Sequence, residues 1–196
     1  RMGVVWLEAP MEAEGSAAVR CSRGEVVAVA SQDWDTLLYG APMMVRNLTS
    51  HGTRKFGRVL HAERIVLSDT LQSHGITREQ LVDLGIMIGT DFHPGIKGIG
   101  PKTGLKLIQK HGTLEAIAEA KGFDVPEDLE AIRELFMDHP AESAPIPKHT
   151  KAVEEEMRAF LQEERGFSEN RMDRALGRLM KAGRLRSANQ PTLFDF

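Results

Sequence analysis

The sequence lacks the features that would place it in a membrane or in an oxidising compartment. Cys21 is its one cysteine among 196 residues, so no disulfide can form within the chain, as expected of a protein of the reducing cytoplasm. No apolar run approaches the length needed to cross a bilayer, and no signal peptide precedes the first predicted strand. A hydrophobic fraction of 41% still suffices for a core, which should include Cys21. We therefore expect a globular protein of the cytoplasm with no membrane partner.

An overall basic charge, the usual mark of a nucleic-acid-binding protein, is also missing, because the formal net charge is -3. The two signs are segregated along the chain. Acidic residues gather between Glu8 and Asp35 and again over 124–134, whereas basic residues gather over 97–110 and 171–186. A metal-dependent nuclease needs carboxylates for its cations and bases for phosphates, so the net charge does not exclude one.

The first third of the sequence predicts an α/β fold. An apolar run at 3–7 is followed by Pro10, which suits the start of a helix through about Arg20, and a β-branched run at 25–30 reads as a second strand. This order predicts a parallel pair with a right-handed crossover. Trp6 is expected to pack at the edge of the core, as is Trp34. Further short strands are predicted at 43–48, antiparallel at an edge, and at 64–67.

From residue 71 onward the pattern is mostly helical. Thr77 and Gln80 form a capping-box signature for a helix through Met87. Gly166 is expected to cap a later helix. The remaining helices are predicted over 103–111, 114–121, 126–137, 154–164 and 168–182.

A glycine-rich turn at 89–102 is the most informative motif. Gly98 and Gly100 lack a side chain, so backbone N–H groups of the turn can approach a phosphate, to which the positive end of the next helix adds attraction. Pro101 suits the first position of that helix. Lysines at four-residue spacing share one of its faces: Lys102, Lys106 and Lys110. Such turns often only join helices, but the lysines and the nearby Asp91 favour a DNA-phosphate site.

Two pairs of carboxylates follow predicted strands, Glu12 with Glu14 and Asp33 with Asp35. Sites in open α/β sheets form beyond the carboxyl ends of strands, so the four should converge, and Asp91 is a fifth candidate. Hard cations such as Mg²⁺ prefer oxygen ligands, and two ions together can activate a water and stabilise the leaving oxygen of a phosphodiester. Each pair alone has a simpler explanation, as helix-dipole glutamates or as a turn.

Taken together, these motifs resemble the structure-specific 5′ nucleases, most closely the flap endonucleases of archaeal type. The resemblance is carried by 8–14, 31–38 and 89–104, in the family's order and spacing, and continues through 160–161 and 165–168. It covers nearly the whole chain but only about the second half of a family member. An N-terminal half would supply further strands, metal ligands and the arch that threads the flap. The chain is therefore expected to be a fragment, a nicked product or one subunit of a split nuclease.

The resemblance implies an incomplete PIN-like α/β core, with a parallel sheet flanked by helices, a helix-three-turn-helix DNA clamp and C-terminal helices. The expected parts are the core at 1–88, the DNA-binding region at 89–122, the helical region at 123–186 and a tail at 187–196. The matched metal ligands, which would hold two Mg²⁺ ions or Mn²⁺ in their place, are Glu12, Glu14, Asp33, Asp35 and Asp91. The matched DNA-binding residues, often assisted by K⁺, are Gly95, Lys97, Gly98, Gly100, Lys102, Lys106 and Lys110.

The C-terminal tail resembles a peptide that binds a sliding clamp (PCNA). Gln190, Leu193 and Phe196 fit its spacing, although the chain stops before the last aromatic residue, and a frayed apolar tail is the alternative. His93 lacks a partner at ligand spacing and is assigned no metal role. Basic residues between 171 and 186 are expected to form a solvated helix face, and contact with DNA is the alternative.

The function implied is a structure-specific flap endonuclease and 5′-3′ exonuclease. It would act on branched DNA in replication and repair, near the archaeal nucleoid, by two-metal phosphodiester hydrolysis. The competing hypothesis is a non-catalytic fragment that binds DNA and the sliding clamp. A small RNA-cleaving or other metal nuclease is a third, disfavoured by the glycine turn and the tail.

Overall fold

The computed structural model describes residues 2–55, 57–141, 144–148 and 150–187. The chain divides into two compact units, Glu8–Ser143 and, as far as they are described, Arg1–Leu7 with Ala144–Phe196. The predicted clamp-binding residues Gln190, Leu193 and Phe196 lie outside the described residues. Each unit is treated by itself below.

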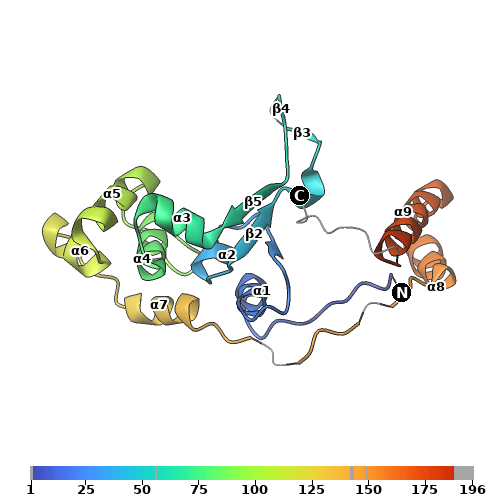
Figure 1. Cartoon of the computed structure of the whole chain (residues 1–196), viewed down its shortest axis with the longest axis horizontal. Coiled ribbons are helices and arrows are strands. Elements are labelled where there is room, and N and C mark those ends of the chain that lie inside the picture. The colour runs from blue at the N-terminus through green and yellow to red at the C-terminus, as the bar shows by residue number, and fades with distance from the viewer. Residues whose placement is uncertain (1, 56, 142–143, 149, 188–196) are drawn as a thin grey trace. The chain divides into compact units, whose positions relative to one another are not determined.

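The larger unit is built on a small mixed sheet (Figure 1), which confirms the α/β class but corrects the predicted parallel sheet. Its strands are β1 (Val29–Ala30), β2 (Met43–Arg46) and β5 (Glu63–Val66), in the order β1-β2-β5. β2 pairs parallel with β1 and antiparallel with β5. Met44 and Val45 are 0% and 4% exposed, so β2 is buried as a central strand and does not lie at the predicted edge.

The strand predicted at 3–7 is absent, and the predicted crossover with it. A strand forms where its N–H and C=O groups join a ladder, and residues 3–7 belong to neither of the two sheets among the described residues. Trp6 is 77% exposed and Trp34 51% exposed, so the expectation that both pack at the core edge is wrong. The run at 25–30 is a strand only at β1, and Val27 is exposed.

Three short helices and a hairpin surround the sheet. The helices are α1 (Ala13–Ser22), α2 (Asp35–Leu38) and α3 (Leu67–His74). α1 starts three residues after Pro10, because Glu12 takes an extended backbone as its N-cap. After β2 come a 3-10 turn, η1 (Leu48–Ser50), and the hairpin β3 (Arg54–Lys55) and β4 (Arg58–Val59).

Four helices complete the larger unit: α4 (Arg78–Ile88), α5 (Pro101–His111), α6 (Leu114–Lys121) and α7 (Leu129–Met137). The Thr77–Gln80 capping box and Pro101 at the start of α5 are confirmed. α5 packs closely on α4 at Gly104, where an added Cβ would lie 2.6 Å from Leu84 Cδ1. These helices, α1 and β1 share one hydrophobic core, which includes Cys21 as expected.

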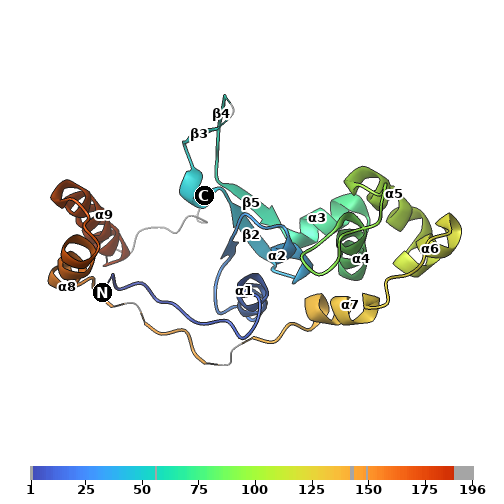
Figure 2. The same ribbon diagram turned by 180° about the vertical axis from the view of Figure 1, so that it is seen from behind.

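The smaller unit is helical: α8 (Glu154–Arg158), a π-helical turn η2 (Ala159–Glu164) and α9 (Glu169–Ser187), seen from behind in Figure 2. Met157, Met172 and Leu176 form its core. Gly166 has a φ of 68°, which suits its predicted capping role. Across the described parts of both units, no helix has the length and apolarity to cross a membrane.

Candidate metal and nucleic-acid sites

Four of the five predicted metal ligands lie at the N-termini of α1 and α2. Glu12 is the N-cap residue of α1 and Glu14 lies in its first turn, whereas Asp33 precedes α2 and Asp35 begins it. Asp35 N–H donates to Asp33 Oδ1 at 3.0 Å. Ser31 joins the two pairs, because its hydroxyl accepts from Asp33 N–H at 3.0 Å and donates to Glu14 Oε1 at 3.5 Å.

The charges of all five carboxylates meet at Asp35. The pKa of Asp35 is raised from 3.8 to about 6: burial is the largest cause, and the charges of Asp33, Asp91, Glu14 and Glu12 add to it in that order. Asp91 acts on Asp35 from the loop between α4 and α5. Among the described residues no ion pair to any of the five carboxylates is formed, and the four leading charges on Asp35 are all negative.

The five carboxylates are linked electrostatically through Asp35, but their positions do not form a complete set of metal ligands. Within the described residues, no three Asp, Glu, His or Cys side chains lie close enough together to hold a metal ion. The donor atoms are nonetheless all carboxylate oxygens, which fit a hard divalent cation and not a soft one. A cation between them would also relieve the repulsion that raises the Asp35 pKa.

Tyr39 was not singled out from the sequence. It is buried behind the acidic residues, and burial raises its pKa above the ordinary value, with Glu12 and Asp35 the largest charges acting on it. The phenol therefore keeps its proton across the physiological range. Tyr39 follows the predicted ligand Asp35 within one helical turn in the sequence, and this spacing could have pointed to it.

The glycine-rich turn after α4 has a defined backbone. Gly95 has a φ of 85° and Gly98 a φ of 86°, a region that favours glycine, and an added Cβ at Gly95 would lie 2.5 Å from Ile88 O. Ile96 N–H donates to Met87 O at 2.8 Å, which ties the turn to α4. Gly100 has a φ of -101°, so its conformation alone does not require glycine.

His93 holds this turn, a role that the sequence did not reveal. Gly95 N–H donates to His93 Nδ1 at 3.0 Å. Ile86 O also lies 3.2 Å from the same nitrogen. One nitrogen cannot accept from Gly95 and donate to Ile86 at once, and we assign the shorter contact, in which Nδ1 carries no proton.

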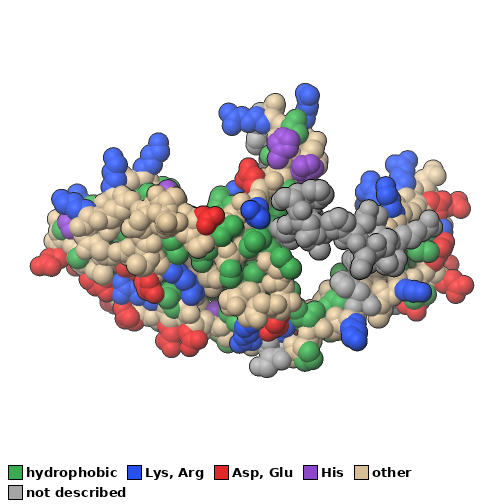
Figure 3. Space-filling model, in the orientation of Figure 1, with side chains coloured by type: hydrophobic (Ala, Val, Ile, Leu, Met, Phe, Trp, Pro, Cys, Tyr) green, Lys and Arg blue, Asp and Glu red, His purple; other side chains and the backbone are tan. Residues whose placement is uncertain are grey.

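The predicted phosphate-binding lysines are all exposed: Lys97, Lys102, Lys106 and Lys110. Figure 3 shows basic side chains projecting over α5 at one rim of the larger unit. The first turn of α5 still has backbone N–H groups without helical partners, although Pro101 supplies none. The turn and the lysines together can therefore attract a phosphate backbone.

A second set of carboxylates, also missed from the sequence, surrounds Arg133 on α7. Buried Asp83 on α4 accepts two hydrogen bonds from this guanidinium, at 2.7 and 2.8 Å, and one from Leu114 N–H at 2.9 Å. Glu115 and Glu130 also pair with Arg133 at 2.6 Å. This network ties α4, α6 and α7 together.

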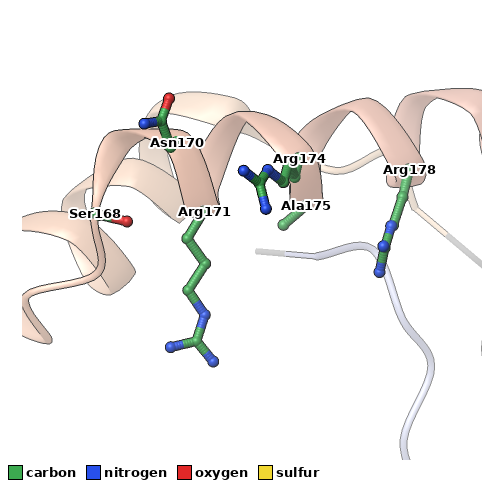
Figure 4. A pocket seen from close by; sticks show the side chains of 6 residues that line it. All are labelled: Ser168, Asn170, Arg171, Arg174, Ala175 and Arg178. Carbon is green, nitrogen blue, oxygen red and sulfur yellow. The ribbon is translucent and has the colours of Figure 1, made fainter.

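The smaller unit carries a basic groove of about 480 Å³ along the first half of α9. Figure 4 shows that Arg171, Arg174 and Arg178 extend from the same side of the helix, as their spacing of three and four residues dictates. Ser168, Asn170 and Ala175 complete the lining. Arg171 also lies over the Phe167 ring at 4.2 Å.

Comparison with known proteins identifies the fold first. The XPG I-region family matches residues 3–91. The flap endonuclease-1 structure from Methanococcus jannaschii superposes with a TM-score of 0.78 at 32% identity, over 91% of this chain and 53% of that one. The catalytic core of Rad2 in complex with a DNA substrate has a TM-score of 0.74 at 19% identity, over 91% and 65%, a likeness of fold alone. The fold of this chain therefore belongs to the class of nuclease folds that these structures represent.

Comparison of the sequence with curated relatives then indicates which of these nucleases the chain resembles. The chain is 46% identical to Flap endonuclease 1 of Methanothrix thermoacetophila, over 91% of this chain and 54% of the relative. It is 42% identical to Flap endonuclease 1 of Pyrobaculum arsenaticum, over 98% and 58%. The chain resembles the flap endonucleases, as its motifs predicted, and fits a C-terminal part of them. It spans about half the length of the relatives it matches.

Proposed function

We propose that this chain provides the C-terminal part of a structure-specific 5′ nuclease that cuts branched DNA near a 5′ flap. The observation that carries the proposal is the crowding of Glu12, Glu14, Asp33 and Asp91 around Asp35, with no cationic side chain to balance them among the described residues. Asp91 belongs to this acidic site and also lies just before the turn over 95–100. Asp91 thus links the candidate metal-binding and phosphate-binding features.

In this proposal the five carboxylates hold two Mg²⁺ ions, for which Mn²⁺ can substitute. Bound there, the ions supply Lewis-acid activation of water and stabilisation of the leaving phosphodiester oxygen. Ser31 orients Asp33 and Glu14 through its two hydrogen bonds. Further ligands would come from an N-terminal half supplied in cis or by a second chain.

The turn over 95–100 and the lysines of α5 bind the duplex through its phosphates, with K⁺ as a candidate bridging ion. Contacts of this kind fix position and read no base edges, so the enzyme should select branched shape without sequence preference. The tail at Gln190, Leu193 and Phe196 remains our candidate for binding a sliding clamp.

The decisive experiment is cleavage of a labelled 5′-flap duplex in Mg²⁺, with the chain alone and with a supplied N-terminal half. Cleavage near the junction is expected, and Asp33→Asn and Asp35→Asn should each abolish it. Glu8→Gln is the matched control, because Glu8 is exposed and is not among the charges that raise the Asp35 pKa. Undiminished cleavage by the two Asp variants would contradict the site.

The phosphate clamp has its own test. Replacing Lys102 and Lys106 together by Ala should weaken binding to duplexes of every sequence and flatten the salt dependence by about 0.9 in log-log slope per lost phosphate contact. Lys121→Ala, exposed at the end of α6, is the control and should change neither quantity. Unchanged binding and slope in the double variant would rule out the clamp.

A second candidate function is a non-catalytic module that docks DNA and the sliding clamp. It is favoured by the α9 groove of the smaller unit, where three arginines offer a cationic surface. Duplex binding without cleavage, even when an N-terminal half is supplied, would support this candidate over the first.

A further inference from the structure

A histidine two residues after the end of α7 packs directly on α1, which carries candidate metal ligands. His139 is 5% exposed. Its ring lies against the α1 backbone at Gly15: a Cβ added there would be 2.5 Å from Cδ2, 2.6 Å from Nε2 and 2.7 Å from Cε1 of the imidazole. Gly15 follows Glu14, so this contact is one residue from the acidic site.

The same ring contacts the end of the second ligand-bearing helix. His139 and Tyr39 meet edge to face, with ring centroids 4.8 Å apart and an interplanar angle of 69°. Tyr39 N–H in turn donates to Asp35 O at 2.9 Å. The imidazole therefore contacts both α1, with Glu12 and Glu14, and the end of α2, with Asp35.

His139 is itself held from the other side. α7 is fixed to α4 by Arg133 and Asp83, and Arg78 on α4 donates to Phe136 O at 2.7 Å. α4 also leads into the glycine-rich turn. A rigid path thus runs from the turn through α4 and α7 to the ring that contacts α1.

The nitrogens of this ring contribute little to its position. Neither has a hydrogen-bond partner among the described protein atoms, and Tyr39 Oη, Ser16 Oγ and Thr36 Oγ1 are likewise buried without one. Packing, not hydrogen bonding to protein, therefore holds the ring. An aromatic ring without nitrogens should occupy the same space and remove two unsatisfied polar atoms.

We propose that His139 is a positioning residue for the candidate metal ligands: its ring sets the spacing of α1 and α2, and so of Glu12 and Glu14 relative to Asp35. The inference rests on the proposed function, because it assigns the ring a role in binding the divalent cation. Gly15 is its necessary counterpart, since only a residue without a side chain leaves room for the ring.

The test is calorimetric titration of the whole chain with Mg²⁺. His139→Ala should weaken Mg²⁺ binding by about tenfold, as removal of an outer support of a metal site typically does, and His139→Phe should restore affinity to within about twofold of wild type. Ile117→Ala, at a buried site on α6, is the control for lost stability and should leave Mg²⁺ affinity unchanged. Gly15→Ala should weaken binding as His139→Ala does, because its methyl displaces the ring.

The measured Mg²⁺ affinities distinguish the role of His139 from the proposed function. Wild-type affinity in His139→Ala, or an equal loss in His139→Phe, would overturn the spacing role while leaving the proposed function intact. If His139→Ala does not fold, Gly15→Ala carries the test, and wild-type Mg²⁺ affinity there would overturn the inference. A wild-type chain that binds no Mg²⁺, alone or with an N-terminal half, would overturn the proposed function and the role of His139 with it.

Discussion

Two sets of carboxylates in the larger unit have opposite electrostatic environments. Asp83, Glu115 and Glu130 gather around one guanidinium, that of Arg133. Glu12, Glu14, Asp33, Asp35 and Asp91 gather around one another. Hydrogen bonding to Arg133 lowers the pKa of Glu115 to about 2, whereas burial and like charges raise that of Asp35 to about 6.

The difference separates structure from candidate function. Asp83 is 4% exposed, and both of its carboxylate oxygens accept hydrogen bonds, from Arg133 and from Leu114 N–H. Its network therefore holds three helices together. The acidic site keeps its repulsion, and no side chain in the described parts of the chain offsets it. In the proposed function, a divalent cation from solution offsets this repulsion.

The largest expected effect comes from breaking the balanced set. Arg133→Met should lower the free energy of unfolding by about 3–5 kcal/mol, because it leaves the buried Asp83 charge without its partner. Urea titration followed by circular dichroism measures this loss. Glu130→Ala is the control: its side chain is 82% exposed in its pair with Arg133, so the change should stay within about 0.5 kcal/mol.

If the two variants lost equal stability, Arg133 would be an ordinary surface cation and the contrast between the two sets would fail. A double variant, Asp83→Leu with Arg133→Met, sharpens the point. It removes both charges, and it should recover most of the stability lost in Arg133→Met.

A smaller effect is expected from the unbalanced set, as a function of pH. The raised pKa of Asp35 means that the folded state binds a proton more tightly than the unfolded state. Without divalent cations, the free energy of unfolding contributed by this group should therefore fall as pH rises from 3.8 to about 6, and then level off.

Asp35→Asn removes that titration. At pH 8 without Mg²⁺ it should be more stable than wild type by about 1–2 kcal/mol, after allowance for solvent screening of a partly exposed group. Adding Mg²⁺ should raise the melting temperature of wild type but not of the variant. A variant less stable than wild type at pH 8 would show that Asp35 is not under electrostatic stress.

The sequence predicted the features that depend on local chemistry. The Thr77–Gln80 capping box, Pro101 at the start of α5 and the apolar periods of α5 and α6 lie where local residues dictate them. The α/β class followed from the same patterns, and the likeness to flap endonucleases from short motifs. These signals need no knowledge of distant partners.

What the sequence did not reveal depends on distant contacts. Residues 3–7 have the composition of a strand but join neither sheet among the described residues. Asp83 and Arg133 are 50 residues apart, and His139 meets Gly15 from the far end of the unit. A lone buried Asp or His gives no local pattern, so such partners emerge only from the fold.

The last prediction concerns the turn over 95–100, next to Asp91 of the unbalanced set, and the smallest stability change in it is that of Gly100. Gly98 and Gly100 form a matched pair for the test. Neither has atoms within 4 Å of an added Cβ, so crowding is equal at the two positions. Gly98 has a φ of 86°, which an L side chain rarely adopts, whereas Gly100 has a φ of -101°. Gly98→Ala should therefore cost about 1–2 kcal/mol of stability and Gly100→Ala about 0.5 kcal/mol or less, measured by thermal unfolding. The DNA affinity of Gly100→Ala tests the phosphate site itself. A methyl at Gly100 would occupy the place where a phosphate is expected, so this variant should bind duplex DNA more weakly than wild type. Full DNA affinity in Gly100→Ala would show that the phosphate does not bind at this turn, and the acidic site would then lose its proposed link to the DNA clamp.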